Sequence, residues 1–362
     1  MDDDDDYNYM LYLQNINTTE DPSHVVSELV QLCAKKTVNI FGSKLIPVFY
    51  FVNFFLSYLG NGLVLLIIFK YEKLTTVTNI FLLNLVLSNL LFASSLPFWA
   101  TYHLSEWIFG EALCKMVSSA YFIGFYSSIL FLTLMTFDRY LAVVHALAAC
   151  KRRKKKYAII SSVIVWCISI SASVKELVLR NVFMNSMQGK MCEESGLSAS
   201  SMRVWRLISF YQQFMIFFLL PLIMVMYCYV RITLRILSTR MKEKCRAIKL
   251  IFVIIFTFFV CWTPYNIVCL LQAINISASE TDKEESCSTK QNLDYAYYLT
   301  RNIAYLYCCI SPMFYTFLGK KFQSHFNKLV IKKIPCLSRH ISFNSQSTRS
   351  TSQRTPHSVY EY

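Results

Sequence analysis

Long apolar segments alternate with short polar segments along most of the chain. Seven apolar segments are about 20 residues long or longer: 44–70, 78–103, 112–144, 157–178, 204–236, 247–274 and 290–318. A helix of about 20 apolar residues crosses a hydrocarbon core about 30 Å thick. Because lipid offers no hydrogen bonds, each segment must satisfy its own backbone groups and is predicted to be a helix. The strands of a membrane barrel would alternate in polarity, and these segments do not.

This pattern predicts an all-α membrane protein, a seven-transmembrane helix bundle with an amphipathic eighth helix. We expect four parts: an acidic extracellular N-terminus at 1–43, the bundle at 44–318, the eighth helix at 319–334 and a disordered cytoplasmic tail at 335–362. The eighth helix places Phe322, Phe326 and Leu329 on one face, as in helices that lie on a membrane surface.

Composition agrees with a membrane protein. Hydrophobic residues make up 55% of the 362 residues, the mean hydropathy is +0.39, and only 16% of residues are charged. A soluble chain has about 25% charged residues, and one of this length would be expected to form two domains. The long apolar segments argue against that arrangement.

The distribution of charge predicts the orientation. The chain has 36 Lys and Arg against 22 Asp and Glu, and the basic residues gather after the first, third, fifth and seventh segments. Basic loops stay on the cytosolic side of a membrane. We therefore expect a multi-pass plasma-membrane protein with its N-terminus outside and its C-terminus in the cytosol. Basic residues in such loops favour anionic membrane lipid as a partner rather than nucleic acid.

Short motifs recur within the apolar segments and at their ends. Asp138-Arg139-Tyr140 closes the third segment, and Pro264 interrupts the sixth, where proline removes a backbone hydrogen bond and permits a kink. Further motif residues are Gly60, Asn61, Trp166, Pro221, Tyr229, Cys261, Trp262, Ser311, Pro312 and Tyr315. A charged pair at a helix end is commonly an interfacial feature, but here the motifs occur in a specific order. Over about 44–334 they resemble those of the rhodopsin-like (class A) G-protein-coupled receptors.

Within that class the chain resembles the chemokine receptors, and most of all the XC-type (lymphotactin) receptor. The resemblance is carried by residues 138–146, 95–99, Trp107, Tyr121, 264–266, 301–302 and 308–309. It implies a receptor that binds a chemokine outside the cell and activates a G protein inside, usually of the Gi type, with calcium signalling and chemotaxis as outcomes. It also implies that receptor kinases and arrestin bind the Ser- and Thr-rich tail.

The resemblance also implies which residues switch the receptor between states. Asp138 would pair with Arg139 in the inactive state, and Arg139 would face the G protein in the active state. Trp262 would move with the kink at Pro264. The set is completed by Tyr140, Tyr229, Pro312 and Tyr315.

The family places its ligand pocket among one set of helix ends, at Trp99, Tyr121, Tyr265 and Arg301. Each aromatic residue has an alternative role in packing or in the interfacial belt. A charge within a membrane span is costly and indicates function. Arg301 replaces a Glu of many relatives, so it is expected to meet an acid on the ligand or on the receptor itself.

The N-terminus is a second candidate for ligand binding. Residues 1–43 hold eight acidic residues and two lysines, and Tyr7, Tyr9 and Tyr12 lie in or just after the Asp run, an acidic context suited to sulfation. A negative segment attracts a basic partner and raises its association rate. A merely solubilising role is the alternative.

Four of the 13 cysteines lie in polar segments: Cys33, Cys114, Cys192 and Cys287. Four cysteines allow three pairings, and the sequence alone leaves the choice open. The resemblance implies Cys114 with Cys192 and Cys33 with Cys287.

Three further features concern modification and ions. Asn17 begins a glycosylation sequon, and Cys336 follows the eighth helix as a palmitoylation site or a free thiol. Asn89 stands where the family has the Asp that anchors a sodium ion, and Ser311 where Asn is usual. An amide supplies oxygen without charge, so the sodium site is expected to be altered.

Other functions were weighed against this one. The six His match no metal spacing and no catalytic motif is present, so the sequence predicts neither an enzyme nor a cofactor. A transporter would need paired charges along a midplane path, and the spans are nearly free of charge. A scavenging receptor that binds ligand but couples weakly remains an alternative because of Asn89 and Ser311.

Overall fold

The computed structural model describes residues 36–72, 74, 76–145, 155–185, 189–239, 245–278, 287–318 and 324–325. The chain divides into a first unit, Met1–Thr37, and a second, Val38–Tyr362. Everything below concerns the second unit. The predictions for Tyr7, Tyr9, Tyr12, Asn17, Cys33, Cys336, the tail and nearly all of the eighth helix lie outside the described residues.

Long helices account for each of the seven predicted spans. They are α3 (Lys36–Tyr71), α4 (Val77–Leu104), α5 (Gly110–Val144), α7 (Lys155–Leu179), α8 (Ala199–Phe214) continued through η1 (Met215–Leu219) into α9 (Leu220–Thr239), α10 (Cys245–Ala278) and α11 (Cys287–Leu318). Within the described residues, six spans are long and apolar enough to cross a membrane. The last helix, α11, covers the seventh predicted segment. The predicted bundle is thus confirmed.

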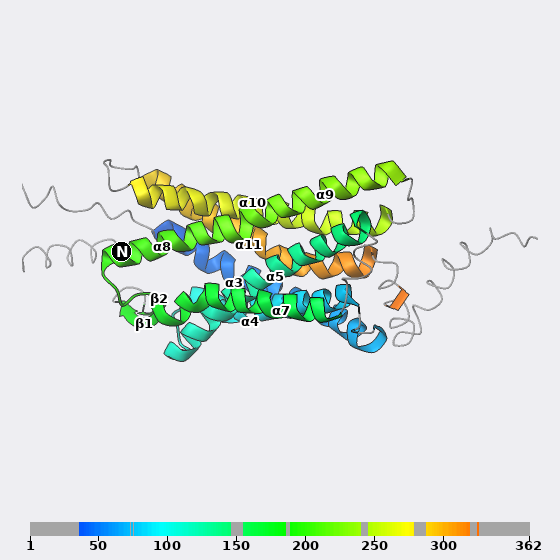
Figure 1. Cartoon of the computed structure of the whole chain (residues 1–362). Helices are drawn as coiled ribbons and strands as arrows, with labels where there is room; N and C mark the ends of the chain where they lie inside the picture. Colours follow the sequence, from blue (N-terminus) through cyan, green and yellow to red (C-terminus); the bar gives the residue numbers. More distant parts are fainter. Residues whose placement is uncertain are drawn as a thin grey trace, which may run out of the picture. The chain divides into compact units, whose positions relative to one another are not determined.

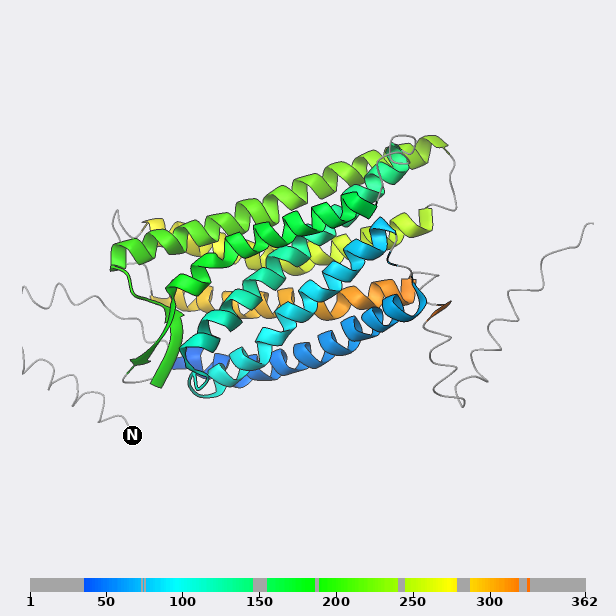
Figure 2. The ribbon, with the colours of Figure 1, turned by 60° about the horizontal axis from the view of Figure 1, so that its bottom comes forward.

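The helices lie side by side along their lengths (Figures 1 and 2). Helix α5 packs against α4, α7 and α9, and α10 packs against α11 and α8. The tightest approach is at Gly124 of α5, where an added Cβ atom would lie 2.5 Å from the backbone nitrogen of Phe92 and 2.8 Å from the carbonyl oxygen of Ser88. Glycine therefore lets α4 and α5 meet backbone to backbone, as small residues do between membrane helices.

Apolar side chains cover the outside of the bundle as well as its core. Phe55 and Leu59 of α3 are 66% and 73% exposed, and Ile160 and Val163 of α7 are 60% and 55% exposed. Apolar surface on this scale is unfavourable in water and is expected where helices contact lipid.

One helix departs from α geometry. Residues Met215–Leu219 form a π turn between α8 and α9, and Pro221 is the second residue of α9. The turn places Phe217 in the core, where its ring stacks on Tyr126 of α5 with 3.8 Å between centroids. Such turns are rare and are frequently found at functional sites.

A β-hairpin at one end of the bundle was not predicted. Strands β1 (Arg180–Asn185) and β2 (Gly189–Glu194) pair antiparallel, and they lie beyond the ends of α7 and α8 (Figures 1 and 2). Trp107, after α4, donates its backbone N–H to the carbonyl of Lys190 at 2.8 Å. We call this end of the bundle the hairpin end.

The predicted disulfide between Cys114 and Cys192 is confirmed. It joins the first turns of α5 to β2, with 5.7 Å between the Cα atoms, and both cysteines are fully buried. Trp107 and Val117 pack around it. The other predicted disulfide cannot be compared, because Cys33 and the side chain of Cys287 lie outside the described residues.

Candidate functional site

The hairpin end holds a half-buried arginine whose guanidinium is enclosed by tyrosines. The guanidinium carbon of Arg301 lies 5.0 Å from the ring centroid of Tyr297, 5.3 Å from that of Tyr298 and 5.8 Å from that of Tyr50. Arginine is attracted to the face of an aromatic ring at such distances, and the attraction strengthens when water is excluded. We call these four residues the Arg301 cage.

Two donors of Arg301 have no acceptor. Its Nε and Nη2 atoms are buried and make no hydrogen bond within the described part of the chain. The side chain as a whole is half-buried, like those of Tyr297 and Tyr298. Leaving a buried donor without an acceptor costs free energy, so these two atoms distinguish Arg301 from the hydrogen-bonded polar groups around it.

The other predicted pocket residues join the cage through ring contacts. Tyr265 lies 5.6 Å from Tyr297, centroid to centroid. The hydroxyl of Tyr121 shares a hydrogen bond of 2.5 Å with that of Tyr305, whose ring lies 5.5 Å from Tyr50. The structure therefore brings Tyr121, Tyr265 and the cage together.

Trp99 lies on the side of this set nearer the hairpin. Its ring is 6.0 Å from Tyr102 and 5.6 Å from the buried Trp107. His103 continues the contacts from Tyr102 to Tyr298 of the cage. All four predicted pocket residues thus belong to one connected set of aromatic contacts.

A network of ion pairs also lies at the hairpin end. Glu176 of α7 is 1% exposed; its carboxylate oxygens lie 2.9 Å from Lys175 Nζ and 2.9 Å from Arg180 Nε, and Lys175 also contacts Glu194 at 3.1 Å. Burial alone would raise the pKa of the Glu194 carboxyl, but Lys175 and Arg180 outweigh burial and hold the pKa below its usual range. The guanidinium of Arg180 lies 5.8 Å from the ring of Trp99. The network therefore fixes the hairpin beside the aromatic set.

Trp262 lies deeper in the bundle and connects with this set. Its ring stacks on Phe125 of α5 at 4.4 Å and lies 5.9 Å from Tyr265 and 6.5 Å from Tyr305. Pro264 lies inside α10 as predicted, and the side-chain amide of Asn266 donates to the Trp262 carbonyl at 2.9 Å.

The opposite end of α5 carries the predicted charged motif. Arg139 Nη2 donates to the Thr78 hydroxyl at 2.9 Å, and that hydroxyl donates to the Asp138 carboxylate at 3.5 Å. Asp138 is 1% exposed. Thr78 of α4 therefore links the two charged residues, a role that the sequence did not indicate. We call this the Asp138 end.

The remaining predicted switch residues are placed as follows. The Tyr140 hydroxyl shares a hydrogen bond of 3.0 Å with His145 Nε2. Tyr229 is buried, with its ring 5.4 Å from that of Phe252 on α10. Pro312 and Tyr315 lie in α11, but their side chains are outside the described part.

Asn89 lies in the middle of the bundle. Its side-chain amide is 1% exposed and donates to Asn61 Oδ1 of α3 at 3.2 Å. On the adjacent helix, Ser127 Oγ donates to Ser88 Oγ at 2.8 Å. The predicted altered sodium site is therefore a neutral hydrogen-bonded region as far as it is described; the Ser311 side chain is not. Across the described residues, no group of three or more His, Cys, Asp or Glu could hold a metal ion.

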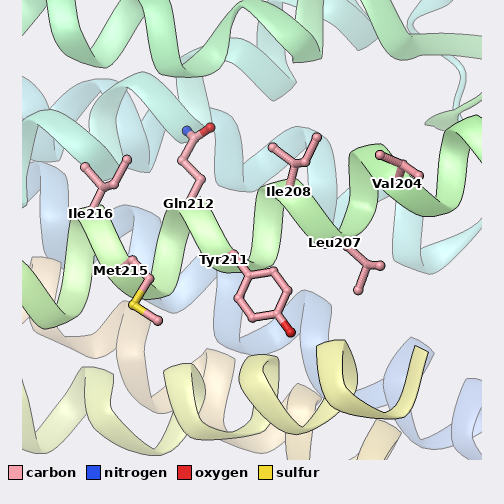
Figure 3. A pocket seen from close by; sticks show the side chains of 7 residues that line it. All are labelled: Val204, Leu207, Ile208, Tyr211, Gln212, Met215 and Ile216. Carbon is pink, nitrogen blue, oxygen red and sulfur yellow. The ribbon is translucent and has the colours of Figure 1, made fainter. Parts of the chain in front are cut away.

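A separate groove of about 520 Å³ runs along α8 and η1 (Figure 3). Its lining is almost entirely apolar: Val204, Leu207, Ile208, Tyr211, Gln212, Met215 and Ile216. Val204 and Ile208 are 54% and 45% exposed, so the groove faces outward. It contains none of the predicted pocket residues, and its chemistry suits lipid.

Some site residues were missed at the sequence level although a signal was present. Tyr297, Arg301 and Tyr305 are spaced four apart, so they share one face of a helix. That spacing would have extended the site from Arg301 to both tyrosines. Tyr50 and His103 carry no such signal, because only the packing of α3 and α4 against α11 brings them there.

Comparison with known proteins identifies the family. Residues 60–315 match the 7 transmembrane receptor (rhodopsin family). The human C-C chemokine receptor type 4 is 35% identical over 297 residues, covering 82% of this chain and 81% of that protein. The chain belongs to the chemokine receptors of the rhodopsin family. This makes it a multi-pass plasma-membrane receptor and not an enzyme, as predicted.

Two further chemokine receptors show the breadth of the likeness. C-C chemokine receptor type 3 of Cavia porcellus is 35% identical over 334 residues, or 91% of each chain. The human Chemokine XC receptor 1 is 38% identical over 286 residues, covering 79% of this chain and 81% of that receptor. The predicted XC-type likeness is therefore present, at an identity similar to that of the CC-type relatives.

Proposed function

We propose that this chemokine receptor binds a basic chemokine at the hairpin end, outside the cell, and activates a Gi-type G protein at the Asp138 end. Calcium signalling and chemotaxis follow from that activation. The observation that supports this most is the unbroken series of ring contacts from the Arg301 cage through Tyr305 to Trp262 and Phe125. Phe125 lies on α5, the helix that carries the charged motif at its other end.

The disulfide supports the proposed orientation. Disulfides persist in oxidising surroundings, so the end with Cys114 and Cys192 is expected outside the cell. The acidic N-terminus then faces the same compartment and attracts the basic ligand, with Tyr7, Tyr9 and Tyr12 as sulfation sites, Asn17 glycosylated and Cys33 paired with Cys287.

Activation is proposed to be a change between two packings of the bundle. A ligand shifts that equilibrium only by its differential affinity for the two states. Movement of Trp262 over Pro264 would open the Asp138 end and free Arg139 from Thr78. Receptor kinases and arrestin would then act on the Ser- and Thr-rich tail, and Cys336 would anchor the eighth helix to lipid.

A panel of chemokines applied to cells that express the receptor tests this function. We expect at least one chemokine to lower cAMP and raise calcium, and Arg139→Ala to abolish both responses while retaining ligand binding. Lys156→Ala is the matched control, because Lys156 is an exposed cation in the first turn of α7. Uptake of a bound chemokine without either response, in cells with the intact receptor, would support the scavenging alternative instead.

A further inference from the structure

The three tyrosines of the Arg301 cage lie against the faces of the guanidinium group and leave one of its edges free. Nε and Nη2 lie on the same edge of the planar group, and both are the buried atoms without a hydrogen bond. This edge is the one that contacts a carboxylate at two points. The three tyrosines hold the cation but accept no hydrogen bond from that edge.

Three acidic residues near the hairpin end have partners other than Arg301. Glu176 and Glu194 are held by Lys175 and Arg180, and Glu106 accepts the backbone N–H of Lys190 at 2.7 Å. No ion pair to Arg301 occurs among the residues described. The receptor thus presents an unpaired, preformed donor edge within the set of residues predicted to meet the ligand.

From this geometry we infer that the Arg301 cage is the subsite for a carboxylate side chain on the segment of the ligand that enters the bundle. The inference rests on the proposed function, because it assumes that a ligand segment reaches this set of residues. A basic group in the same place would meet a like charge in a poorly hydrated site, which is strongly unfavourable. The preferred ligand is therefore bipolar: a basic body for the acidic N-terminus of the receptor, and an Asp or Glu at the tip that enters.

Full-length receptor in lipid nanodiscs provides a direct test with small probes. The probes are N-acetyl-glutamate amide, its neutral isostere N-acetyl-glutamine amide, and N-acetyl-lysine amide. A ligand that binds only the folded state raises the melting temperature by an amount that grows with the logarithm of its concentration once that concentration exceeds the dissociation constant. We expect the glutamate probe to raise the melting temperature at concentrations where the glutamine and lysine probes do not.

Substitutions then locate the effect. Arg301→Gln is expected to raise the dissociation constant of the glutamate probe, fitted from the melting-temperature shifts, at least about tenfold, as for loss of a charged two-point contact. Arg301→Lys keeps the charge but not the fork and should give an intermediate value, which keeps the test valid if the glutamine variant does not fold. Arg301→Glu should reverse the preference toward the lysine probe. Lys115→Gln, which removes a cation paired with Glu111 on the surface of α5, should leave binding unchanged.

Equal stabilisation by the glutamate and glutamine probes, or the same glutamate response in the receptor and its Arg301→Gln variant, would overturn the inference. This outcome differs from failure of the proposed function. The probes need no G protein, so a receptor silent to every chemokine could still bind the glutamate probe. Conversely, a chemokine response unaffected by Arg301→Gln would leave the function standing and reject the subsite.

Discussion

Single residues set the chemistry of the bundle interior, and Asn89 is the clearest case. Its neutral amide donates to Asn61 in a fully buried position where the family carries an aspartate. Hard cations such as sodium prefer charged or multiple oxygen ligands. The amide N–H directed at the Asn61 oxygen also occupies an oxygen that a cation would need.

Agonist affinity of this receptor is therefore expected to be the same in sodium and potassium buffers of equal ionic strength. Asn89→Asp should introduce a sodium-specific decrease in agonist affinity, because a carboxylate restores the missing charge. Competition binding assays in the two salts measure the agonist affinity of the unaltered receptor and of the Asn89→Asp variant. Asn84→Asp is the control. It makes the same change at another asparagine of α4, whose side-chain oxygen accepts a hydrogen bond from the Trp166 indole N–H. A sodium-specific effect already present in the unaltered receptor would contradict this prediction.

The same residue scale shows what a sequence reveals about a site. Arg301 was identifiable because a lone charge within an apolar segment is costly. The aromatic enclosure of Arg301 was not identifiable from the sequence. Tyr50, Tyr297 and Tyr298 are ordinary aromatic residues until the packing of α3 against α11 places them around one cation. Thr78 was not predicted for a similar reason. Its hydrogen bonds with Asp138 and Arg139 depend on α4 lying beside the end of α5.

At the scale of elements, the contact between α4 and α5 depends on Gly124. Gly124→Ala is expected to lower the melting temperature of the receptor, because a methyl group would meet the backbone of α4 at Phe92 and Ser88. Overpacking of this kind costs about 1–3 kcal/mol. Thermal unfolding followed by fluorescence of a thiol-reactive dye measures the change.

Gly62→Ala is the matched control for that substitution. An added Cβ atom at Gly62 of α3 meets nothing within 4 Å. Both substitutions share the gain in helix propensity of about 1 kcal/mol from Gly to Ala, so their difference isolates the close approach. Equal melting temperatures for the two variants would show that α4 and α5 move apart without cost.

Helices and hairpin differ in how far the sequence predicted them. The spans were predictable because lipid demands long apolar segments whose backbone bonds are internal. The hairpin was not, because its two strands have only six residues each, with polar residues among them. Its pairing depends on contacts with Trp107, Cys114 and Glu106, which are distant in the sequence.

At the scale of the whole molecule, the disulfide joins segments 78 residues apart. Removing it with the double change Cys114→Ser and Cys192→Ser is expected to lower the melting temperature. Loss of a native disulfide typically costs about 2–5 kcal/mol, chiefly through the freedom regained by the unfolded chain. Chemokine binding should fall as well, since β2 would no longer be fixed beside Trp99.

Cys167→Ser is the control for the disulfide, because Cys167 is an exposed free thiol on α7. Melting curves and ligand binding measured for both variants and the unaltered receptor distinguish the effects. If the double variant had the same melting temperature as the unaltered receptor, the ionic network of Glu176, Arg180 and Glu194 would be sufficient to keep the hairpin in place.

The π turn at Met215–Leu219 affects how this receptor can be recombined with others. One residue in a helix corresponds to a rotation of about 100°, and the extra residue of a π turn is absorbed before α9 begins. Cys228 and Ile232 of α9 pack with Tyr140 only in this rotational register. A chimera that replaced the fifth span with an uninterrupted α-helix would therefore present a different face of α9 to the Asp138 end, even if every residue there were preserved.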